Sequence, residues 1–141
     1  MRFMMIVKAN ADSETGRLPS TEELTEMGKY NEELVKAGIL LAGEGLHPSS
    51  KGARVAFSKT GSTVTDGPFS ETKELVAGFW IIEVKSREEA IAWARRIPFK
   101  EGEVEIRQVA MAEDFAPSDP TGELRAKEEA LRAQVEAKAK A

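Results

Sequence analysis

The sequence predicts an α+β fold, and three observations support that prediction. Apolar runs of strand length recur along the chain, and two helix-capping motifs are each followed by apolar residues at helical spacing. Segments with strand patterns alternate with segments with helix patterns along the sequence. Hydrophobic residues make up 41% and charged residues 31% of the 141 residues, which favours one soluble globular domain of ordinary size over a disordered chain.

The first half of the chain reads as strand, helix and strand. Residues 3–7 form a short apolar run of strand length, and the polar residues 12–19 are predicted to be a loop. Ser20 and Glu23 fit a capping box, and Gly38 is a helix stop. The predicted helix between them carries apolar residues at helical spacing: Leu24, Met27, Leu34 and Val35. Residues 39–42 then form a second apolar run.

The second half reads as hairpin, strand, helix and strand. Residues 55–57 and 63–65 flank a turn-forming stretch and predict a hairpin, and residues 76–84 form a long strand. Ser86 opens a second capping box, whose helix is stopped by Pro98. Residues 103–109 alternate between apolar and charged side chains, which is typical of a half-exposed strand.

This order is a βαββαβ plan with a hairpin insert, the ferredoxin-like arrangement. The strands at residues 3–7, 39–41 and 79–82 are apolar on both faces, so the sheet face that the helices leave free should also be covered. We expect a second copy to cover it, with two sheets packed face to face in a homodimer. The alternative is that the C-terminal helix covers this face.

The tail differs from the rest of the chain, and we expect a domain at residues 1–112 and a linker with a helical tail at residues 113–141. Asp119 and Pro120 resemble a cap followed by proline at the first helical position. Only Leu124, Leu131 and Val135 form an apolar stripe in this helix. The sequence therefore predicts a partly solvated helix, with a helix that contacts the partner subunit as the alternative.

Composition excludes several classes of function. The net charge of −4 argues against a nucleic-acid surface. The chain has no cysteine and a single histidine, His47, so we expect no metal site and no cofactor. No apolar stretch near the N-terminus has the length of a signal or a membrane span. We expect a cytoplasmic protein that does not bind membranes.

Ionisable side chains gather in residues 64–74. Asp66 precedes Gly67-Pro68, so its carboxylate either caps a turn or acts as a base at a strand end beside a cleft. Lys73 and Glu74 follow closely, and Lys73 is a natural ion-pair partner for Glu44, Asp66 or Glu74.

Two further positions could carry chemistry. Glu44 lies between two glycines at the end of the second strand, which indicates either a bulge or room for a ligand beside the carboxylate. His47 follows it and is the only side chain whose ordinary pKa lies near neutrality, although a lone histidine before proline is more often a surface loop residue. Phe79 and Trp80 point to opposite faces of one strand, so one of them should lie in the core.

Three blocks of sequence resemble a known family. They are residues 3–7, residues 42–48 (Ala-Gly-Glu-Gly-Leu-His-Pro) and residues 64–74 with Asp66-Gly67-Pro68-Phe69 at their centre. The chain resembles the YCII-related proteins, specifically the branch named for its Asp-Gly-Pro-Phe (DGPF) motif. The resemblance implies a dimeric α+β barrel with a pocket in each subunit. Some relatives look like cofactor-free lyases or dehalogenases, and others are encoded beside alternative sigma factors. This chain departs from the better-known members because its first helix has no histidine.

These observations support three hypotheses. The first is a small-molecule-binding protein, accessory to a stress or transcription pathway, whose ligand contacts Glu44, Asp66, Lys73, Glu74 and Trp80. The second is a cofactor-independent lyase, isomerase or dehalogenase in which Asp66 or Glu44 acts as base and His47 or Lys73 as acid. The third is a structural dimer module in which the motif only builds a strand connection. We rank binding above catalysis, and both above a structural role.

Overall fold

The structure, a computed structural model, describes residues 1–140 and confirms an α+β fold. The chain forms two compact units, Met1–Val109 and a second unit that begins at Ala110. The elements of the first unit are β1 (Arg2–Lys8), α1 (Ala11–Glu14), α2 (Thr21–Lys36), β2 (Leu40–Gly45), η1 (Ser49–Lys51), β3 (Ala53–Ser58), β4 (Gly61–Asp66), η2 (Thr72–Glu74), β5 (Val76–Glu83), α3 (Arg87–Arg95) and β6 (Val104–Gln108). The second unit contains η3 (Ala112–Ser118) and α4 (Glu123–Lys140).

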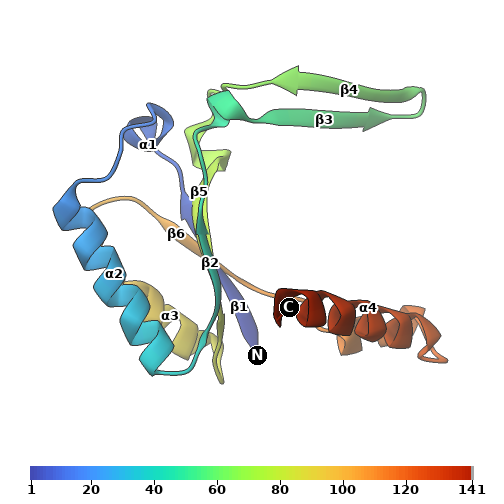
Figure 1. The fold of residues 1–141 in the computed structure, drawn as a ribbon. Helices are drawn as coiled ribbons and strands as arrows, with labels where there is room; N and C mark the ends of the chain where they lie inside the picture. The colour runs from blue at the N-terminus through green and yellow to red at the C-terminus, as the bar shows by residue number, and fades with distance from the viewer. Residues whose placement is uncertain (141) are drawn as a thin grey trace. The chain divides into compact units, whose positions relative to one another are not determined.

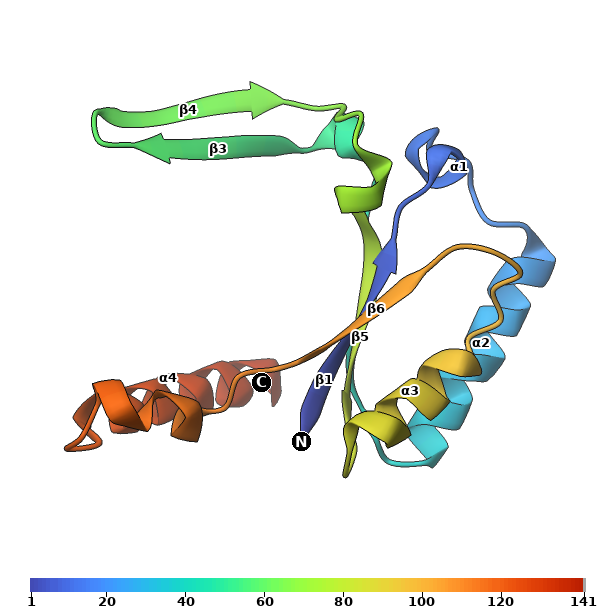
Figure 2. The same ribbon diagram turned by 180° about the vertical axis from the view of Figure 1, so that it is seen from behind.

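Four strands form an antiparallel sheet in the order β2-β5-β1-β6. β1 pairs with β5 on one side and β6 on the other, which makes the first strand of the chain a central one. The strands β3 and β4 form a separate two-stranded sheet, which is the hairpin expected between the second and third strands of the main sheet. α2 and α3 cover one face of the four-stranded sheet (Figures 1 and 2).

Burial alternates along the strands because one sheet face carries the helices. Gly78, Trp80 and Ile82 of β5 are buried, whereas Phe79 and Ile81 between them are only half-buried. The prediction that Phe79 and Trp80 face opposite sides of the sheet is confirmed, with Trp80 in the core. The core cluster joins this strand to β1 and to both helices; its buried members are Phe3, Met5, Tyr30, Leu34, Trp80, Ile82, Val84, Ala90 and Ile97.

The helix boundaries follow the capping signals. The Ser20 side chain accepts a hydrogen bond from the Glu23 amide, and Ser86 does the same for Glu89 on α3. Gly38 adopts a φ of +73° just after α2, a backbone conformation that favours glycine, as a helix stop requires. These local predictions are confirmed because a cap depends only on residues within one turn.

The predicted apolar face of α2 is partly wrong. Leu24 and Val35 are 59% and 63% exposed, whereas Tyr30 and Leu34 are the buried residues of this helix. Tyr30 can enter the core because its hydroxyl donates to the main-chain oxygen of Trp93 on α3 (2.8 Å). The side of α2 that faces the core therefore carries Tyr30 and Leu34, and it leaves Leu24 and Val35 outside.

Two local predictions are corrected. Residues 12–19 are not wholly a loop, because α1 spans Ala11–Glu14 and is capped reciprocally by Asn10 and Ser13. Pro120 does not occupy the first helical position, because α4 begins only at Glu123.

Asp119 nevertheless caps α4 from a distance. Its carboxylate accepts from the amides of Leu124 and Arg125, and it pairs with the Arg125 side chain. These hydrogen bonds, chiefly that from the Arg125 amide, lower the pKa of Asp119. None of the helices in residues 1–140 combines the length and the hydrophobicity of a transmembrane segment.

Candidate functional site

A cavity of about 360 Å³ lies between α2 and the helix-facing side of the sheet. α2 supplies Met27 and Asn31, β5 supplies Trp80, and three glycines of β2 and β5 line the cavity on the sheet side. The complete lining is Val7, Met27, Asn31, Leu40, Gly43, Glu44, Gly45, Ala77, Gly78, Phe79, Trp80 and Phe99. We call this space the inner cavity. It is mostly apolar, with few polar groups, as small-molecule sites generally are.

Trp80 forms a fixed wall of the inner cavity. Its Nε1 donates to Oδ1 of Asn31 (2.9 Å), and its ring packs edge-on against Tyr30 with 5.5 Å between centroids. Only 7% of Trp80 is exposed. Burial also raises the pKa of Tyr30 to about 12, so its hydroxyl remains a neutral donor to Trp93. The wall is therefore held by hydrogen bonds at both aromatic rings.

The three glycines have different roles. A Cβ on Gly43 would lie 2.9 Å from Cδ1 of Trp80, so glycine is required there for the indole to sit against β2. A Cβ on Gly78 would meet the Glu44 carbonyl at 2.8 Å. A Cβ on Gly45 would have no heavy atom within 4 Å, so Gly45 borders open space at the cavity.

A second, wider cavity of about 500 Å³ adjoins the first, and the two share Val7, Met27, Ala77 and Phe99 in their linings. We call it the outer cavity. The segment from Asn10 to Glu26 and the loop from Pro98 to Glu103 border it. Its acidic side chains are Asp12, Glu22, Glu23, Glu26, Glu101 and Glu103, against the basic Lys8, Arg17 and Lys100. The outer cavity is therefore net negative and disfavours anions.

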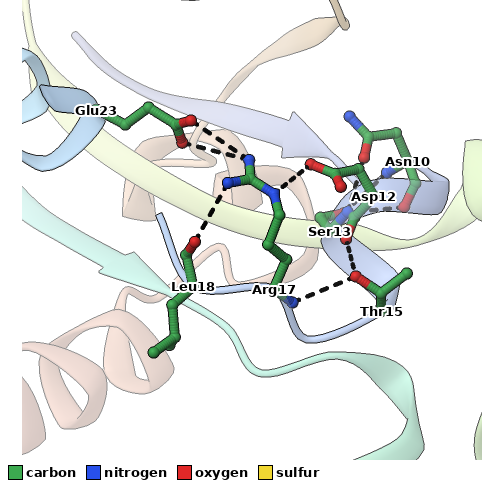
Figure 3. A network of polar contacts seen from close by, with 7 residues as sticks. All are labelled: Asn10, Asp12, Ser13, Thr15, Arg17, Leu18 and Glu23. Carbon is green, nitrogen blue, oxygen red and sulfur yellow. Dashed lines mark hydrogen bonds and ion pairs between the residues drawn. The ribbon is translucent and has the colours of Figure 1, made fainter. Parts of the chain in front are cut away.

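Arg17 braces one side of the outer cavity. Its Nε donates to Asp12 (2.9 Å), and one terminal nitrogen lies 3.4 Å from both carboxylate oxygens of Glu23 (Figure 3). Its other terminal nitrogen donates to the main-chain oxygen of Leu18. The two carboxylates raise the pKa of Arg17. Arg17 thus ties α1 to the first turn of α2 through the loop between them.

Two of the residues singled out by the sequence, Glu44 and Trp80, line the inner cavity. Gly43 pairs with Trp80 across β2 and β5, and Glu44 pairs with Phe79. Alternation along the strand directs the Glu44 carboxylate to the sheet face away from α2, together with Phe79. The main chain of Glu44 therefore borders the cavity, whereas the Glu44 carboxylate lies on the opposite face of the sheet.

The remaining predicted residues lie elsewhere in the chain. Asp66 ends β4, Lys73 and Glu74 lie in η2, and His47 follows β2, all of them exposed. None of the four lines the inner or the outer cavity. Within residues 1–140 no ion pair includes Lys73, so the predicted pairs with Glu44, Asp66 and Glu74 are not formed.

The Asp66–Phe69 turn is anchored to η1 rather than to a cavity. The Glu14 carboxylate accepts from the amide and the hydroxyl of Ser49, and the Ser49 hydroxyl in turn accepts from the Phe69 amide (2.9 Å). Hydrogen bonds from Ser49 lower the pKa of Glu14. A Cβ on Gly67 would lie only 1.8 Å from the Ser49 carbonyl, and the Arg54 guanidinium stacks over the Phe69 ring at 3.8 Å. We call this group the hairpin clamp.

The sequence did not predict that Asn31, Gly45 and Phe99 line the inner cavity. Gly43, Gly45 and Gly78 carried a visible signal, because glycine within a strand marks close approach or missing side-chain volume. Asn31 carried none, since its position opposite Trp80 depends on how α2 packs on the sheet. No three His, Cys, Asp or Glu side chains among residues 1–140 are grouped so that they could hold a metal ion.

Comparison with known proteins identifies the family of this chain. The family model described as the YCII-related domain matches residues 1–115. An uncharacterized protein of Rhizobium meliloti (strain 1021) is similar, with 32% identity over 91 residues, 62% of this chain and 73% of the relative. The region that matches the family model contains the four-stranded sheet, α2, α3 and the β3–β4 hairpin, and it ends within η3. The chain belongs to the YCII-related family.

Proposed function

We propose that this protein binds a small organic molecule in the inner cavity. The observation that carries the proposal is the space between α2 and the sheet, where Gly45 borders open space and Trp80 forms a wall. The indole is held by Asn31 and Tyr30 before any ligand arrives. A preformed wall of this kind lowers the entropic cost of binding.

The linings suggest the chemistry of the ligand. An apolar or aromatic body would contact Trp80, Met27 and Phe99 in the inner cavity. One lone pair of Asn31 Oδ1 is used by Trp80, and the Asn31 amide group has two further donors for an acceptor on the ligand. The net negative outer cavity favours a neutral or cationic group at the other end of the molecule.

A catalytic role has less support than binding. Glu44 is the single ionisable residue in the lining of the inner cavity, as far as residues 1–140 are described, and alternation directs its carboxylate to the other sheet face. A lyase, isomerase or dehalogenase without a cofactor needs an acid or base within hydrogen-bonding reach of the reacting atom. Asp66 and His47 would have to be brought to a ligand from outside this cavity.

We also propose a homodimer of the dimeric α+β barrel type, within the DGPF branch of the family. The strand order β2-β5-β1-β6 is the order of a ferredoxin-like sheet, and α2 and α3, the long helices of the first unit, lie on one face and leave the other face uncovered within that unit (Figures 1 and 2). That face carries the half-buried apolar side chains of Met4, Ile6, Phe79 and Ile81. Packing two such faces together would remove them from water.

Ligand-observed NMR with a fragment library tests the binding proposal. The library should contain neutral, cationic and anionic fragments with aromatic or aliphatic bodies. We expect wild-type protein to bind neutral or cationic members with dissociation constants of about 1 mM or tighter, as is usual for fragments in a formed pocket. Gly45→Phe should fill the cavity and abolish this binding.

The control for the filled cavity is Gly28→Phe. Gly28 also has open space around its Cβ, but it lies outside the cavity lining on α2. Circular dichroism must show that both variants fold. The proposal fails if folded Gly45→Phe protein binds the same fragments as tightly as wild type.

A further inference from the structure

We infer that the β3–β4 hairpin is an arm that packs its apolar face against the same face of the hairpin of a second copy, in antiparallel orientation. We call residues 53–66 the arm. The inference rests on the proposed homodimer and adds a second contact to it, because the two sheet faces cover each other and the two arms cover each other. It is carried by the apolar face of the arm, the direction in which the arm projects and the charges at its two ends.

The arm has an apolar face that the rest of the described chain leaves exposed. Every residue of β3 and β4 is exposed. Val55 pairs with Val64, and Phe57 on the same strand face pairs with Ser62, so the three apolar side chains share one face. Phe57 is 85% exposed, Val64 63% and Val55 51%. A two-stranded hairpin alone is marginally stable in water, so packing of this face would stabilise the arm.

The other face of the arm contacts its own subunit at the base. Arg54 lies on that face, one residue before Val55, and its guanidinium stacks over the Phe69 ring at 3.8 Å. The Gly67 amide donates to the Gly52 carbonyl (2.9 Å), which joins the two chain segments at the base of the arm. The hairpin clamp therefore holds the arm through its polar face and leaves the apolar face available to a partner.

The arm projects from the sheet on the side opposite α2 and α3, which is the side of the proposed partner (Figures 1 and 2). In Figure 1 the strands of the main sheet overlap, so the sheet is seen nearly on edge, whereas β3 and β4 lie one above the other. The two faces of the arm therefore point along the main sheet and not toward the sheet of the partner. Contact between the two sheets leaves the apolar face of each arm uncovered.

Two-fold symmetry can bring the two arms together. A two-fold axis between the facing sheets, along the direction of β5, keeps both arms at one end of the dimer and reverses the direction in which they project. The arms then lie antiparallel, with the same face of each in contact, as in any isologous interface. In this arrangement β3 lies opposite the partner's β3, so Phe57 contacts the partner's Val55, and Ser62 of β4 contacts the partner's Val64.

Charges at the two ends of the arm are complementary in this arrangement. Asp66 ends β4 at the base, on the same face as Val64, and Lys59 lies in the turn at the tip. Within residues 1–140 neither Lys59 nor Asp66 takes part in an ion pair. Antiparallel packing places each Lys59 beside the partner's Asp66, whereas parallel packing would place like charges together. The charges therefore favour a second, antiparallel copy of the arm as the occupant of this face.

The contact between the arms supplements the contact between the sheets and does not replace it. A buried aromatic side chain removes about 150–250 Å² from water, so the two copies of Phe57 would bury about 300–500 Å². A standard interface buries roughly 1,600 Å². Loss of the arm contact should therefore weaken the dimer without abolishing it.

Sedimentation equilibrium of the full chain measures the contribution of the arm. We expect wild-type protein to have the mass of two chains. Phe57→Asp should raise the dimer dissociation constant by at least about 10-fold, because it places a carboxylate in an apolar contact. Ala56→Asp is the matched control, since Ala56 is exposed on the other face of the same strand, and it should leave the constant unchanged. Circular dichroism checks that each variant folds.

Disulfide cross-linking tests the contact and its direction, because the chain has no cysteine. Ser62→Cys chains are mixed with Val64→Cys chains that carry a size tag, and mild oxidation is followed by non-reducing electrophoresis. We expect a covalent heterodimer, since these two positions oppose each other across the arms. Thr63→Cys, on the other face of β4, is the matched control and should not cross-link with Val64→Cys. Lys59→Cys chains should not cross-link with one another, because antiparallel packing separates the two tips.

The outcomes separate the arm contact from the dimer. If wild-type protein is a dimer, the arm contact is overturned when Ser62→Cys and Val64→Cys chains do not cross-link, or when Phe57→Asp associates as tightly as the control. Cross-linking of the Lys59→Cys tips to each other would overturn the antiparallel orientation. If wild-type protein is a monomer, the dimer and the arm contact both fail. None of these results bears on fragment binding to the inner cavity, which Gly45→Phe tests separately.

Discussion

Gly43 and Trp80 are coupled at the scale of single residues. Gly43→Ala would place a Cβ 2.9 Å from the indole and displace it from Asn31. We expect the free energy of unfolding to fall by about 1–3 kcal/mol, as overpacking in a formed core usually costs. Urea denaturation followed by tryptophan fluorescence measures this change.

The matched control for this substitution is Gly45→Ala on the same strand. Its new Cβ would have no heavy atom within 4 Å, so the unfolding free energy should stay within about 1 kcal/mol of wild type. Equal losses for the two alanine variants would show that strand propensity, rather than the indole contact, explains the effect.

Glu14 should give the fold a pH-dependent contribution. Hydrogen bonds from Ser49 lower the pKa of Glu14 below its ordinary value of 4.5, so the folded state favours the carboxylate. That stabilisation is fully present above the unfolded pKa and is lost as pH falls through the folded pKa. We expect Glu14→Gln to lower the melting temperature at neutral pH, and we expect this deficit to shrink as the pH falls below 4.5 and through the folded-state pKa of Glu14.

Differential scanning calorimetry across this pH range measures the deficit, with Glu32→Gln as the control at an exposed position of α2. A melting deficit for Glu14→Gln that stays constant from neutral to acid pH would rule out the charged hydrogen bond as its source.

At the scale of elements, the Asp66–Phe69 turn is a structural joint between the β3–β4 hairpin and η1. Gly67→Ala would put a Cβ 1.8 Å from the Ser49 carbonyl, which is backbone and cannot move aside as a flexible side chain can. We expect a loss of more than about 2 kcal/mol in unfolding free energy, measured by urea denaturation.

Gly52→Ala is the control for the joint. Gly52 pairs with Gly67 through its carbonyl, but a Cβ there would make only an ordinary contact at 3.5 Å. A Gly67→Ala protein as stable as Gly52→Ala would mean that the turn tolerates the displacement and that the hairpin clamp does not fix the β3–β4 hairpin.

The elements themselves were largely predictable from local sequence. Caps at Ser20 and Ser86, the stop at Gly38 and the hairpin all depend on residues within a few positions of one another. The cap that Asp119 provides for α4 was harder to predict from the sequence, because the Asp119 carboxylate accepts from amides five and six residues away.

At the scale of the whole molecule, the sequence predicted two members of the cavity lining and could not define the cavity itself. Trp80 was found because its strand is apolar on both faces, and Glu44 because two glycines flank it. The orientation of Glu44 was beyond the sequence, since β2 contains a register shift between Leu40 and Ala42 that changes the alternation along the strand. Asn31 depends on helix packing, which has no local signal.

The central claim is that the inner cavity is a binding site, and the two tryptophans allow a direct test. In the heteronuclear NMR spectrum of nitrogen-labelled protein each indole N–H gives one signal, and Trp93→Phe assigns them. Trp80 lines the cavity, whereas Trp93 lies on α3 outside it, stacked with Arg96. On titration with the fragments that bind best, we predict that the Trp80 indole signal shifts in a saturable way and that the Trp93 signal stays in place. A saturable shift of Trp93 with no change at Trp80 would contradict the claim.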